Sequence, residues 1–359
     1  MVPQGFKKIN ALARRLEQRE EHKIYIVSHR LPSNGWFKGA ISIAVILFCM
    51  SWGPLMPLVV AVLFGMGYTT AVVVTVVLLA ASMILADHSP RWCRFYLNAA
   101  GWFEKGVFIH MEHRAIKAIK DNASMWCMHP HGTAIGFGFS LNGAVRLRAE
   151  DEVRYLPLEF VRDVSIDRLR RSDGVQAPVL FKIPLVRSAL LGFGCCTPAT
   201  KKDMHKLFER KIDFGILPGG MEEVALYTKG RERVYLKKRA GFIKYALQHG
   251  YLVQPAYTFG ECDLYTSMTA GASLRMWMLK KWGFVVPVFW GPRWYAPFLP
   301  RSDVALNTVV GSPLKLPTIA EPTNEEVALW HSKYIAALTE IFDTYKHRFG
   351  YGDRVLEVL

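Results

Sequence analysis

Residues 125–132 read Met125-Trp126-Cys127-Met128-His129-Pro130-His131-Gly132. The four apolar residues predict a buried strand, which ends at the proline because proline has no N–H to donate and a fixed φ. Gly132 gives the backbone room for a rigid turn that presents two imidazoles. Since imidazole titrates near neutral pH, either His129 or His131 is a candidate general base for activating a hydroxyl group. An ordinary turn and a pair of metal ligands are the alternatives for the same residues.

A second motif follows the apolar run 214–217 and reads Pro218-Gly219-Gly220-Met221-Glu222-Glu223. The glycine pair lets the backbone amides of Gly219 and Gly220 approach a ligand closely. A carboxylate after the turn, such as Glu223, can hold an imidazole or a hydroxyl group. Taken alone, P-G-G is a common turn, and its glutamates are solvated in most proteins.

A third motif is the predicted helix 238–249, which Gly250 ends as the residue after the last turn. Basic residues crowd its N-terminus, where the helix dipole also favours anions. Lys238, Arg239 and Lys244 are therefore candidate ligands of a phosphate-bearing substrate. A charged helix face without a ligand is the alternative.

The composition favours an acidic partner, because the 359 residues carry a formal net charge of +15. Nucleic acid is disfavoured, since the chain has no long basic tract, zinc-finger spacing or aromatic RNA-binding motif. The six cysteines form no C-x-x-C pair. This usage is typical of a reduced, cytosol-facing protein.

Residues 39–86 contain no charged residue and no histidine. A spanning helix needs about 20 apolar residues, so this stretch predicts a transmembrane hairpin with spans at 40–64 and 68–86. Pro54 and Pro57 are expected to kink the first span. Basic residues lie outside both spans, so both ends are expected to face the cytosol. A buried helical pair of a soluble protein is the alternative.

Residues 1–38 form a basic cytosolic segment in this interpretation, and 87–359 form the following domain. Within 1–38, residues 7–23 suit either an amphipathic helix on a membrane surface or a solvated charged helix. From residue 87 on, apolar runs alternate with helical patterns, which predicts a mixed α/β sheet covered by helices. The runs and helical segments lie at 125–128, 133–148, 154–160, 163–171, 213–217, 238–249 and 252–259.

Two further segments carry structural expectations. Thr323 and Glu326 form a capping box that opens an amphipathic helix ending at Gly350, which is expected to serve packing. Residues 277–299 are rich in tryptophan, tyrosine and phenylalanine around three prolines. Such a stretch is typical of a membrane interface, and an aromatic core cluster is the alternative.

Together the motifs resemble the diacylglycerol acyltransferase type 2 family, which also holds monoacylglycerol and wax-alcohol acyltransferases. The resemblance covers most of the chain, from the apolar hairpin to the segment near the C-terminus. Its motifs are H-P-H-G at 129–132, P-G-G-x-x-E at 218–223, R-x-G-F-x-K-x-A-L-x-H-G at 239–250, Y-T-F-G-E at 257–261 and T-V-V-G-x-P at 308–313. One departure is Trp102-Phe103-Glu104, where the family usually has Y-F-P.

The resemblance implies a glycerolipid acyltransferase-like α/β fold and transfer of an acyl group from acyl-CoA to diacylglycerol, giving triacylglycerol. It implies the endoplasmic reticulum membrane, or a lipid droplet surface, as the location. Acyl-CoA, the lipid acceptor and the bilayer are the expected partners, and a homo-oligomer is left open. Acyl-CoA is a co-substrate, and no cofactor or metal is expected.

For the chemistry, the resemblance implies direct transfer assisted by His129 or His131. Related glycerolipid acyltransferases orient the histidine with an acidic residue five positions later, whereas Ala134 and Gly136 stand at those positions here. Glu223 is therefore the predicted substitute in space. The amides of the glycine pair are predicted to bind the oxyanion, and the three basic residues of 238–249 to bind the CoA phosphates.

An acyl-enzyme is not expected, because the cysteines lack an obvious base partner and no serine lies in G-x-S-x-G. Monoacylglycerol or a long-chain alcohol is an alternative acceptor, since an apolar cavity selects it. Two alternatives belong to other classes: a metal-dependent membrane hydrolase that uses the two histidines as ligands, and a non-catalytic scaffold that bends membranes.

Overall fold

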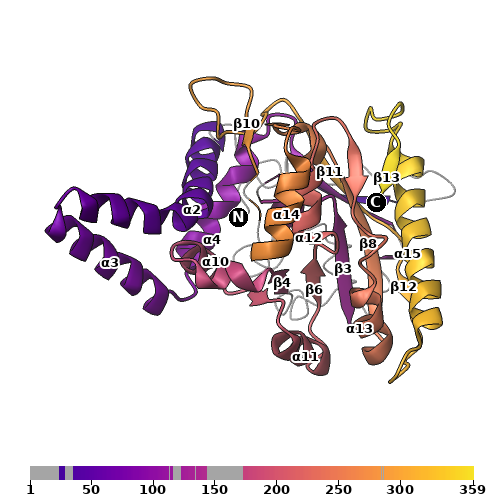
Figure 1. The fold of residues 1–359 in the computed structure, drawn as a ribbon. Coiled ribbons are helices and arrows are strands. Elements are labelled where there is room, and N and C mark those ends of the chain that lie inside the picture. The colour runs from indigo at the N-terminus through magenta and orange to yellow at the C-terminus, as the bar shows by residue number, and fades with distance from the viewer. Residues whose placement is uncertain are drawn as a thin grey trace, which may run out of the picture.

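One mixed β-sheet forms the centre of the molecule (Figure 1). The computed structural model describes residues 24–28, 35–112, 114–115, 123–133, 135–143, 173–283, 285 and 287–359. Within these residues the strand order is β1-β2-β11-β8-β3-β6-β4-β5, and β12 pairs with β8. The strands are β1 Ile24–Ser28, β2 Val107–Glu112, β3 Ser124–His129, β4 Asp173–Gln176, β5 Cys196–Pro198, β6 Phe214–Ile216, β8 Leu252–Phe259, β11 Leu306–Val310 and β12 Leu314–Lys315.

Five neighbouring strands of this sheet, β8, β3, β6, β4 and β5, run parallel to one another. The register pairs Ser124 with Leu252 at one end of β3 and His129 with Tyr257 at the other. Parallel strands end at the same edge of a sheet, and open α/β sheets bind ligands outside that edge. The residues that follow β8, β3 and β6 therefore meet at one place, which is where the site lies.

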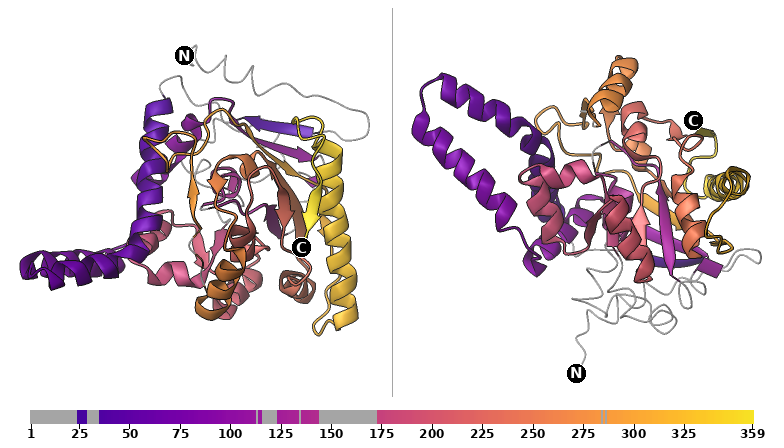
Figure 2. Two further views of the ribbon diagram at one scale, coloured as in Figure 1. Left: turned by 45° about the horizontal axis from the view of Figure 1, so that its top comes forward. Right: turned by 60° about the horizontal axis from the view of Figure 1, so that its bottom comes forward.

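Helices cover both faces of the sheet, as the alternation of apolar and helical segments predicted. One core lies beneath α11 Lys201–Glu209, α13 Gly241–His249 and α15 Asn324–Tyr345. The second lies beneath α2 Gly35–Gly65, α4 Pro90–Leu97, η1 Asn98–Trp102 and α6 Phe137–Gly143. Figures 1 and 2 show α15 on the side of the molecule opposite to α2 and α3 Thr69–Ile84.

Shorter elements complete the domain around the site. These are η3 Pro178–Lys182, α10 Val186–Gly192, α12 Gly220–Leu226, η4 Glu261–Asp263 and α14 Ala272–Trp282. Two small sheets pair β9 Thr266–Ser267 with β10 Phe289–Trp290, and β7 Glu232–Val234 with β13 Leu356–Val358. At the departure from Y-F-P, Trp102 and Phe103 are buried in the second core.

Most predicted elements are present, but two helices begin later than predicted: α13 begins at Gly241 rather than at residue 238, and α6 begins at Phe137 rather than at residue 133. The strand at 252–259 has the predicted bounds, and Gly250 ends α13 in the left-handed conformation with φ of 62°. The capping box of Thr323 and Glu326 is present, although α15 ends at Tyr345 and a turn continues to Gly350. The elements predicted at 7–23, 154–160 and 163–171 lie outside the described residues.

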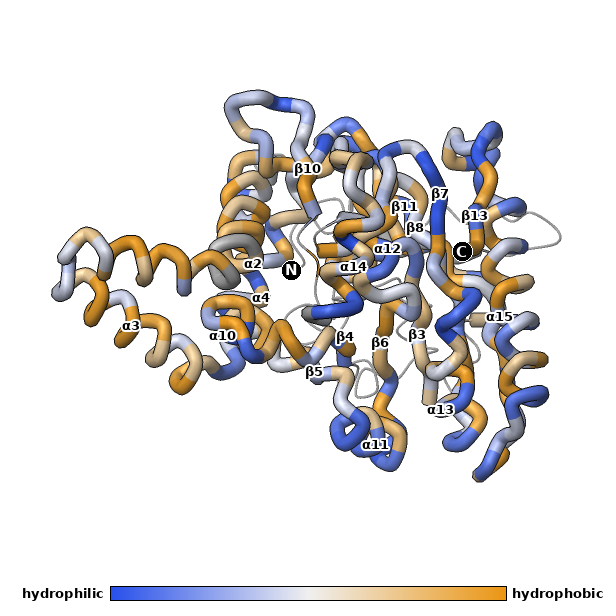
Figure 3. The backbone as a smooth tube through the Cα atoms, viewed as in Figure 1, coloured by the Kyte–Doolittle hydropathy of each residue, from blue (hydrophilic) through white to orange (hydrophobic). Residues whose placement is uncertain are grey.

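The apolar hairpin consists of α2 and α3, which break between Gly65 and Thr69 as predicted (Figure 3). The first half of α2 packs into the second core through Ile43, Ile46 and Leu47. Among the described residues no single helix is both long and apolar enough to cross a membrane. Residues 35–50 and 55–65, bent by 70° against each other, meet the length and composition criteria as a pair.

The aromatic segment 277–299 lies largely at the surface and is not the aromatic core cluster weighed as an alternative. Trp294 is 90% exposed and Tyr295 67% exposed. Trp277, Trp290 and Phe298 are exposed as well. The backbone of this segment is nevertheless fixed, because Gly291 donates to the carbonyl of Pro297 and Leu299 is buried.

Candidate functional site

The end of β3 separates the two histidines of the H-P-H-G motif, because His129 is the last residue of the strand and His131 lies in the turn that follows it. Met125, Cys127 and His129 share one face of the strand, in the core beneath α13 and α15. Only 1% of the surface of His129 is exposed. Trp126 and Met128 point to the other face and line a cavity, which His131 also lines.

His129 is held by protein groups at both ring nitrogens. Its Nδ1 lies 3.2 Å from Oε1 of Glu223, and because a carboxylate can only accept, Nδ1–H is the donor. Its Nε2 lies 3.0 Å from the Tyr334 hydroxyl, which also donates to the carbonyl of Cys127 at 3.4 Å. The sequence predicted Glu223 as the partner of either His129 or His131, and the structure places its carboxylate at the ring of His129. With both nitrogens occupied, the ring of His129 offers no free acceptor to a substrate.

Glu223 fixes the turn that carries both histidines. Besides the ring of His129, its carboxylate accepts the backbone N–H of His131 at 2.7 Å and that of Tyr235 at 3.0 Å. Burial raises the pKa of Glu223, but the attraction of His129 and these hydrogen bonds outweigh burial and hold the pKa below its usual 4.5. The carboxylate is therefore ionised at neutral pH.

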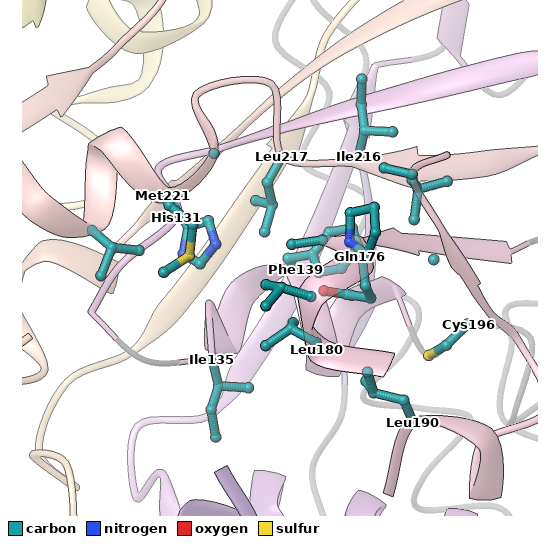
Figure 4. A pocket seen from close by; sticks show the side chains of 18 of the residues that line it. His131, Ile135, Phe139, Gln176, Leu180, Leu190, Cys196, Ile216, Leu217 and Met221 are labelled. Atoms are coloured by element: carbon teal, nitrogen blue, oxygen red, sulfur yellow. The ribbon is translucent and has the colours of Figure 1, made fainter. Parts of the chain in front are cut away.

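His131 lies on the wall of the cavity (Figure 4). Its Nδ1 is buried and has no hydrogen-bond partner among the residues that the structure describes. Burial lowers the pKa of His131 below the usual 6.5; the negative charge of Glu223 opposes this shift, and His129 adds to it. An unprotonated imidazole with an unpartnered nitrogen is what a general base requires.

The cavity is large, apolar and built from both halves of the chain. Its volume is about 1470 Å³, above the range of about 300–1,000 Å³ that is usual for small-molecule sites. Figure 4 shows His131 with Ile135, Phe139, Leu180 and Leu190 around the same space. At one end Ile46 and Met50 of α2 join the wall. A long hydrocarbon chain matches this lining.

Two of the three predicted phosphate ligands lie at the cavity, and the third does not. Lys238 and Arg239 contribute to its lining, as does Lys280 of α14. Lys244 is exposed on α13 and does not line it. Arg239 also forms an ion pair with Glu222, so part of its charge is already neutralised.

The glycine pair of the second motif leaves room for the carboxylate of Glu223 as well as forming the turn. A side chain at Gly219 would collide with Oε1 of Glu223, so glycine is required for the observed packing. The N–H of Gly220 donates to the carbonyl of Leu217 at 3.0 Å and is already engaged. Gly219 is therefore the better placed of the two predicted oxyanion donors.

The sequence analysis missed two residues of this region. Tyr334 was assigned to a packing helix, yet its hydroxyl reaches His129 across 205 residues of sequence. No role was predicted for Glu261 of the Y-T-F-G-E motif, yet its carboxyl group is buried beside the H-P-H-G turn. The Y-T-F-G-E segment was the available signal for Glu261, whereas an amphipathic helix gave none for Tyr334.

Within the described part of the chain, no three side chains of histidine, cysteine, aspartate and glutamate lie close enough together to hold a metal ion. His131 lines the cavity, whereas the ring of His129 lies in the core with Glu223 and Tyr334 already at its two nitrogens. The arrangement can instead accept a proton at His131 beside a fixed negative charge.

Comparison with known proteins gives a consistent set of relatives. A family model described as diacylglycerol acyltransferase matches residues 165–358. Diacylglycerol O-acyltransferase 1 of Eremothecium gossypii is 34% identical over 189 residues, which are 50% of this chain and 41% of that protein. Acyl-CoA wax alcohol acyltransferase 2 of Mus musculus is 34% identical over 185 residues, 48% of this chain and 55% of the other.

Diacylglycerol O-acyltransferase 2 of Homo sapiens is 32% identical over 191 residues, 50% of this chain and 49% of that protein. The chain thus spans about half the length of the curated relatives it matches. Among solved structures, the 1-acyl-sn-glycerophosphate acyltransferase PlsC of Thermotoga maritima has a TM-score of 0.40 at 11% identity, covering 86% of this chain and 95% of that one.

Proposed function

Because the chain belongs to the diacylglycerol acyltransferase family, we propose that it transfers a fatty acyl group from acyl-CoA to the free hydroxyl of diacylglycerol and so forms triacylglycerol. Residues 87–359 are the proposed acyltransferase unit. In this proposal acyl-CoA is a co-substrate, and the protein's own side chains carry out the transfer without a further cofactor.

The observation that carries the proposal is the environment of His131. His131 lines an apolar cavity, its Nδ1 has no hydrogen-bond partner among the described residues, and Glu223 is fixed beside the turn by three hydrogen bonds. His131 takes the proton from the acceptor hydroxyl, and the oxygen attacks the thioester carbonyl. The tetrahedral intermediate collapses to the ester, and the CoA thiolate takes the proton back from His131.

Glu223 and His129 act through the turn in this mechanism. The carboxylate of Glu223 stabilises the imidazolium that forms on His131, since its negative charge favours the protonated ring. His129, held between Glu223 and Tyr334, keeps that carboxylate in place. The amide of Gly219 is the proposed donor to the oxyanion.

The cations in the lining of the cavity suit the CoA part of the donor. Lys238 and Arg239 line the cavity, and its apolar lining suits the acyl chain. Phosphate groups form strong charge-assisted hydrogen bonds with such cations. Lys244, which does not line the cavity, is not part of this proposed seat.

Membrane attachment completes the proposal. The apolar surfaces of α2 and α3 and the exposed aromatic residues of 277–299 suit a bilayer and its interface. We therefore place residues 39–86 in the endoplasmic reticulum membrane as a hairpin, with the basic segment 1–38 and the domain on the cytosolic side. The same attachment also suits a lipid droplet surface, and a homo-oligomer is compatible with it.

A second acceptor has support of its own. A wax alcohol acyltransferase matches the chain at the same 34% identity as the first diacylglycerol acyltransferase. A long-chain alcohol, or monoacylglycerol, would use the same base and the same acyl donor. Only the fit of the acceptor in the apolar cavity would differ.

The test uses microsomes from a host that lacks neutral-lipid synthesis and expresses the chain. Radiolabelled oleoyl-CoA is supplied with diacylglycerol, monoacylglycerol or hexadecanol. We expect labelled triacylglycerol, reduced about 10²- to 10⁴-fold by His131→Ala, which is the usual contribution of a general base. His129→Gln, which keeps polar groups near both partners, is expected to retain more activity than His131→Ala.

Each other outcome has a distinct meaning. Label only in diacylglycerol or wax ester would keep the chemistry and change the acceptor. Full activity of His131→Ala would contradict the assigned base. Release of labelled free oleate that a chelator abolishes would favour the metal-dependent hydrolase class, and neither transfer nor release would favour the scaffold.

A further inference from the structure

Glu261 is a buried carboxyl group that the proposed chemistry does not use. It begins η4, directly after β8 and Gly260, and only 2% of its surface is exposed. Because β8 runs parallel to β3, the carboxyl ends of both strands meet at one edge, and Glu261 lies beside the H-P-H-G turn. None of the ion pairs in the described residues involves it.

The carboxylate of Glu261 contacts the backbone at three residues, two in the first turn of α6 and one in the turn after β3. Its Oε1 accepts the N–H of Phe137 at 3.0 Å, and its Oε2 accepts the N–H of Gly138 at 2.7 Å. These N–H groups belong to the first turn of α6 and have no partner within the helix. A Cβ added to Gly132 would lie 2.5 Å from Oε1, so the carboxylate also packs directly against Gly132.

These contacts connect Glu261 to His131 through the backbone. Gly132 follows His131 in the chain, and Gly136 packs against the carbonyl of His131. On the other side, Phe139 and Ser140 of α6 line the same cavity as His131. A shift of the carboxylate would therefore move both the turn that carries the imidazole and the wall opposite to it.

We propose that Glu261 is a positioning residue, which holds the turn after H-P-H-G against the first turn of α6 and so fixes the imidazole of His131 in the cavity. The proposal rests on the acyl transfer proposed above in so far as it concerns turnover. Its structural part, the anchoring of Phe137 and Gly138, is independent of that activity.

The protonation state of Glu261 matters to this role. Burial raises the pKa of Glu261 to about 7, although the bonds from Gly138 and Phe137 oppose the shift. The titratable groups that face it are Tyr227, Cys262 and Tyr265, whose own pKa values burial raises, so they stay neutral. Below about pH 7 a proton on the carboxyl group removes one of the two acceptors.

The experiment compares the unmodified protein with Glu261→Gln and with Glu340→Gln, a matched change at an exposed site on α15. Transfer from oleoyl-CoA is measured between pH 5.5 and 8.5, and amide hydrogen exchange is measured by mass spectrometry. We expect Glu261→Gln to lower kcat about tenfold or more, because a small displacement of a catalytic group is costly. KM for oleoyl-CoA is expected to stay within about twofold.

Two further readouts separate positioning from simple loss of stability. The activity of the unmodified protein should fall as the pH drops through about 7. Glu261→Gln should not show this decrease, and its activity should fall only at the lower pH at which His131 becomes protonated. The amides of Phe137 and Gly138 should exchange about tenfold faster in Glu261→Gln. Glu340→Gln should match the unmodified protein in both.

Wild-type kcat with an unchanged pH limb in Glu261→Gln would overturn the proposal. If the unmodified protein transfers to no acceptor, the proposed function fails, and unchanged exchange at Phe137 and Gly138 would then overturn the anchoring separately. Should Glu261→Gln not fold, Glu261→Asp replaces it: a shortened carboxylate should lower kcat and speed this exchange, and wild-type values for both would contradict the role.

Discussion

Glu223 holds several parts of the site together through its three hydrogen bonds. It accepts hydrogen bonds from the ring of His129 and from the N–H groups of His131 and Tyr235, all within the protein interior. One carboxylate therefore fixes a strand end, a turn and the segment before α13. The same contacts make it both a structural and a functional residue, and pH can separate the two roles.

Glu223→Gln should destabilise the fold, because an amide cannot accept all three bonds and a buried donor left unpaired costs about 1–3 kcal/mol. Since the pKa of Glu223 lies below 4.5 in the folded chain, its stabilisation is complete above that pH and is lost as pH falls through the folded pKa. Thermal unfolding in detergent at about pH 7 and about pH 4 measures this, and the difference between the two proteins should shrink at the lower pH. A difference that stays constant or grows would contradict the assignment.

At the residue scale the sequence predicted which groups meet but not how they are arranged. The order of motifs was enough to predict Glu223 beside the H-P-H-G turn, as the partner of either His129 or His131. It could not distinguish His129 from His131, because that distinction depends on the packing of Tyr334 of α15 against His129 and on the path of the turn that brings His131 to the cavity. Tyr334 was out of reach for the same reason: its contact with His129 exists only once α15 is packed on the sheet.

Individual elements were predicted well where the chain carries its own boundary signals. Gly250 and Gly260 bracket β8, and both adopt positive φ, so the strand could be read from residues 252–259. The capping box likewise located the start of α15. The η3 and α10 segments contribute Leu180 and Leu190 to the cavity wall but carry no chemical motif and only short helical runs, so the sequence did not assign them to the site.

The N-terminal end of α13 offers a test with a built-in control. Lys238 lines the cavity and Lys244 lies outside it, although both belong to the same basic motif. Lys238→Gln should raise KM for oleoyl-CoA about fivefold with little change in kcat, as expected for one exposed charge on a phosphate. Lys244→Gln should leave KM unchanged.

Initial rates at saturating diacylglycerol measure both the KM for oleoyl-CoA and kcat. The effect of Lys238→Gln should also diminish as salt is raised, since exposed charges are screened over about 10 Å at 0.1 M. Equal increases of KM in the two variants would mean that the motif acts through its general positive charge. A fall of kcat alone would assign Lys238 to the fold rather than to the substrate.

Helix α2 belongs both to the apolar hairpin and to the α/β domain. The first half of α2 is part of the protein core, whereas its second half and α3 expose apolar side chains (Figure 3). Removal of the entire stretch 39–86 would therefore open the core around Trp102. The composition of 39–86 predicted the hairpin but not this shared role, because burial against η1 is a property of the folded chain.

Substitution of exposed residues alone avoids that difficulty. Four apolar side chains of the hairpin are between 52% and 63% exposed, and none of them packs in a core: Leu58, Val62, Val73 and Val77. Replacing these four by glutamine should leave the fold intact, because the buried positions of α2 are untouched. It should weaken membrane attachment, since each amide loses hydration when it enters hydrocarbon.

Alkaline carbonate washing of microsomes gives the measurement. The unmodified protein should remain in the membrane pellet, and the quadruple variant should move largely to the supernatant while it keeps a cooperative unfolding transition. Leu329→Gln with Val355→Gln changes exposed apolar residues outside the hairpin and should remain in the pellet. If the quadruple variant also resists washing, the hairpin is not the anchor. The exposed aromatic segment around Trp294 would then be the next candidate, because Trp and Tyr favour the interface on their own.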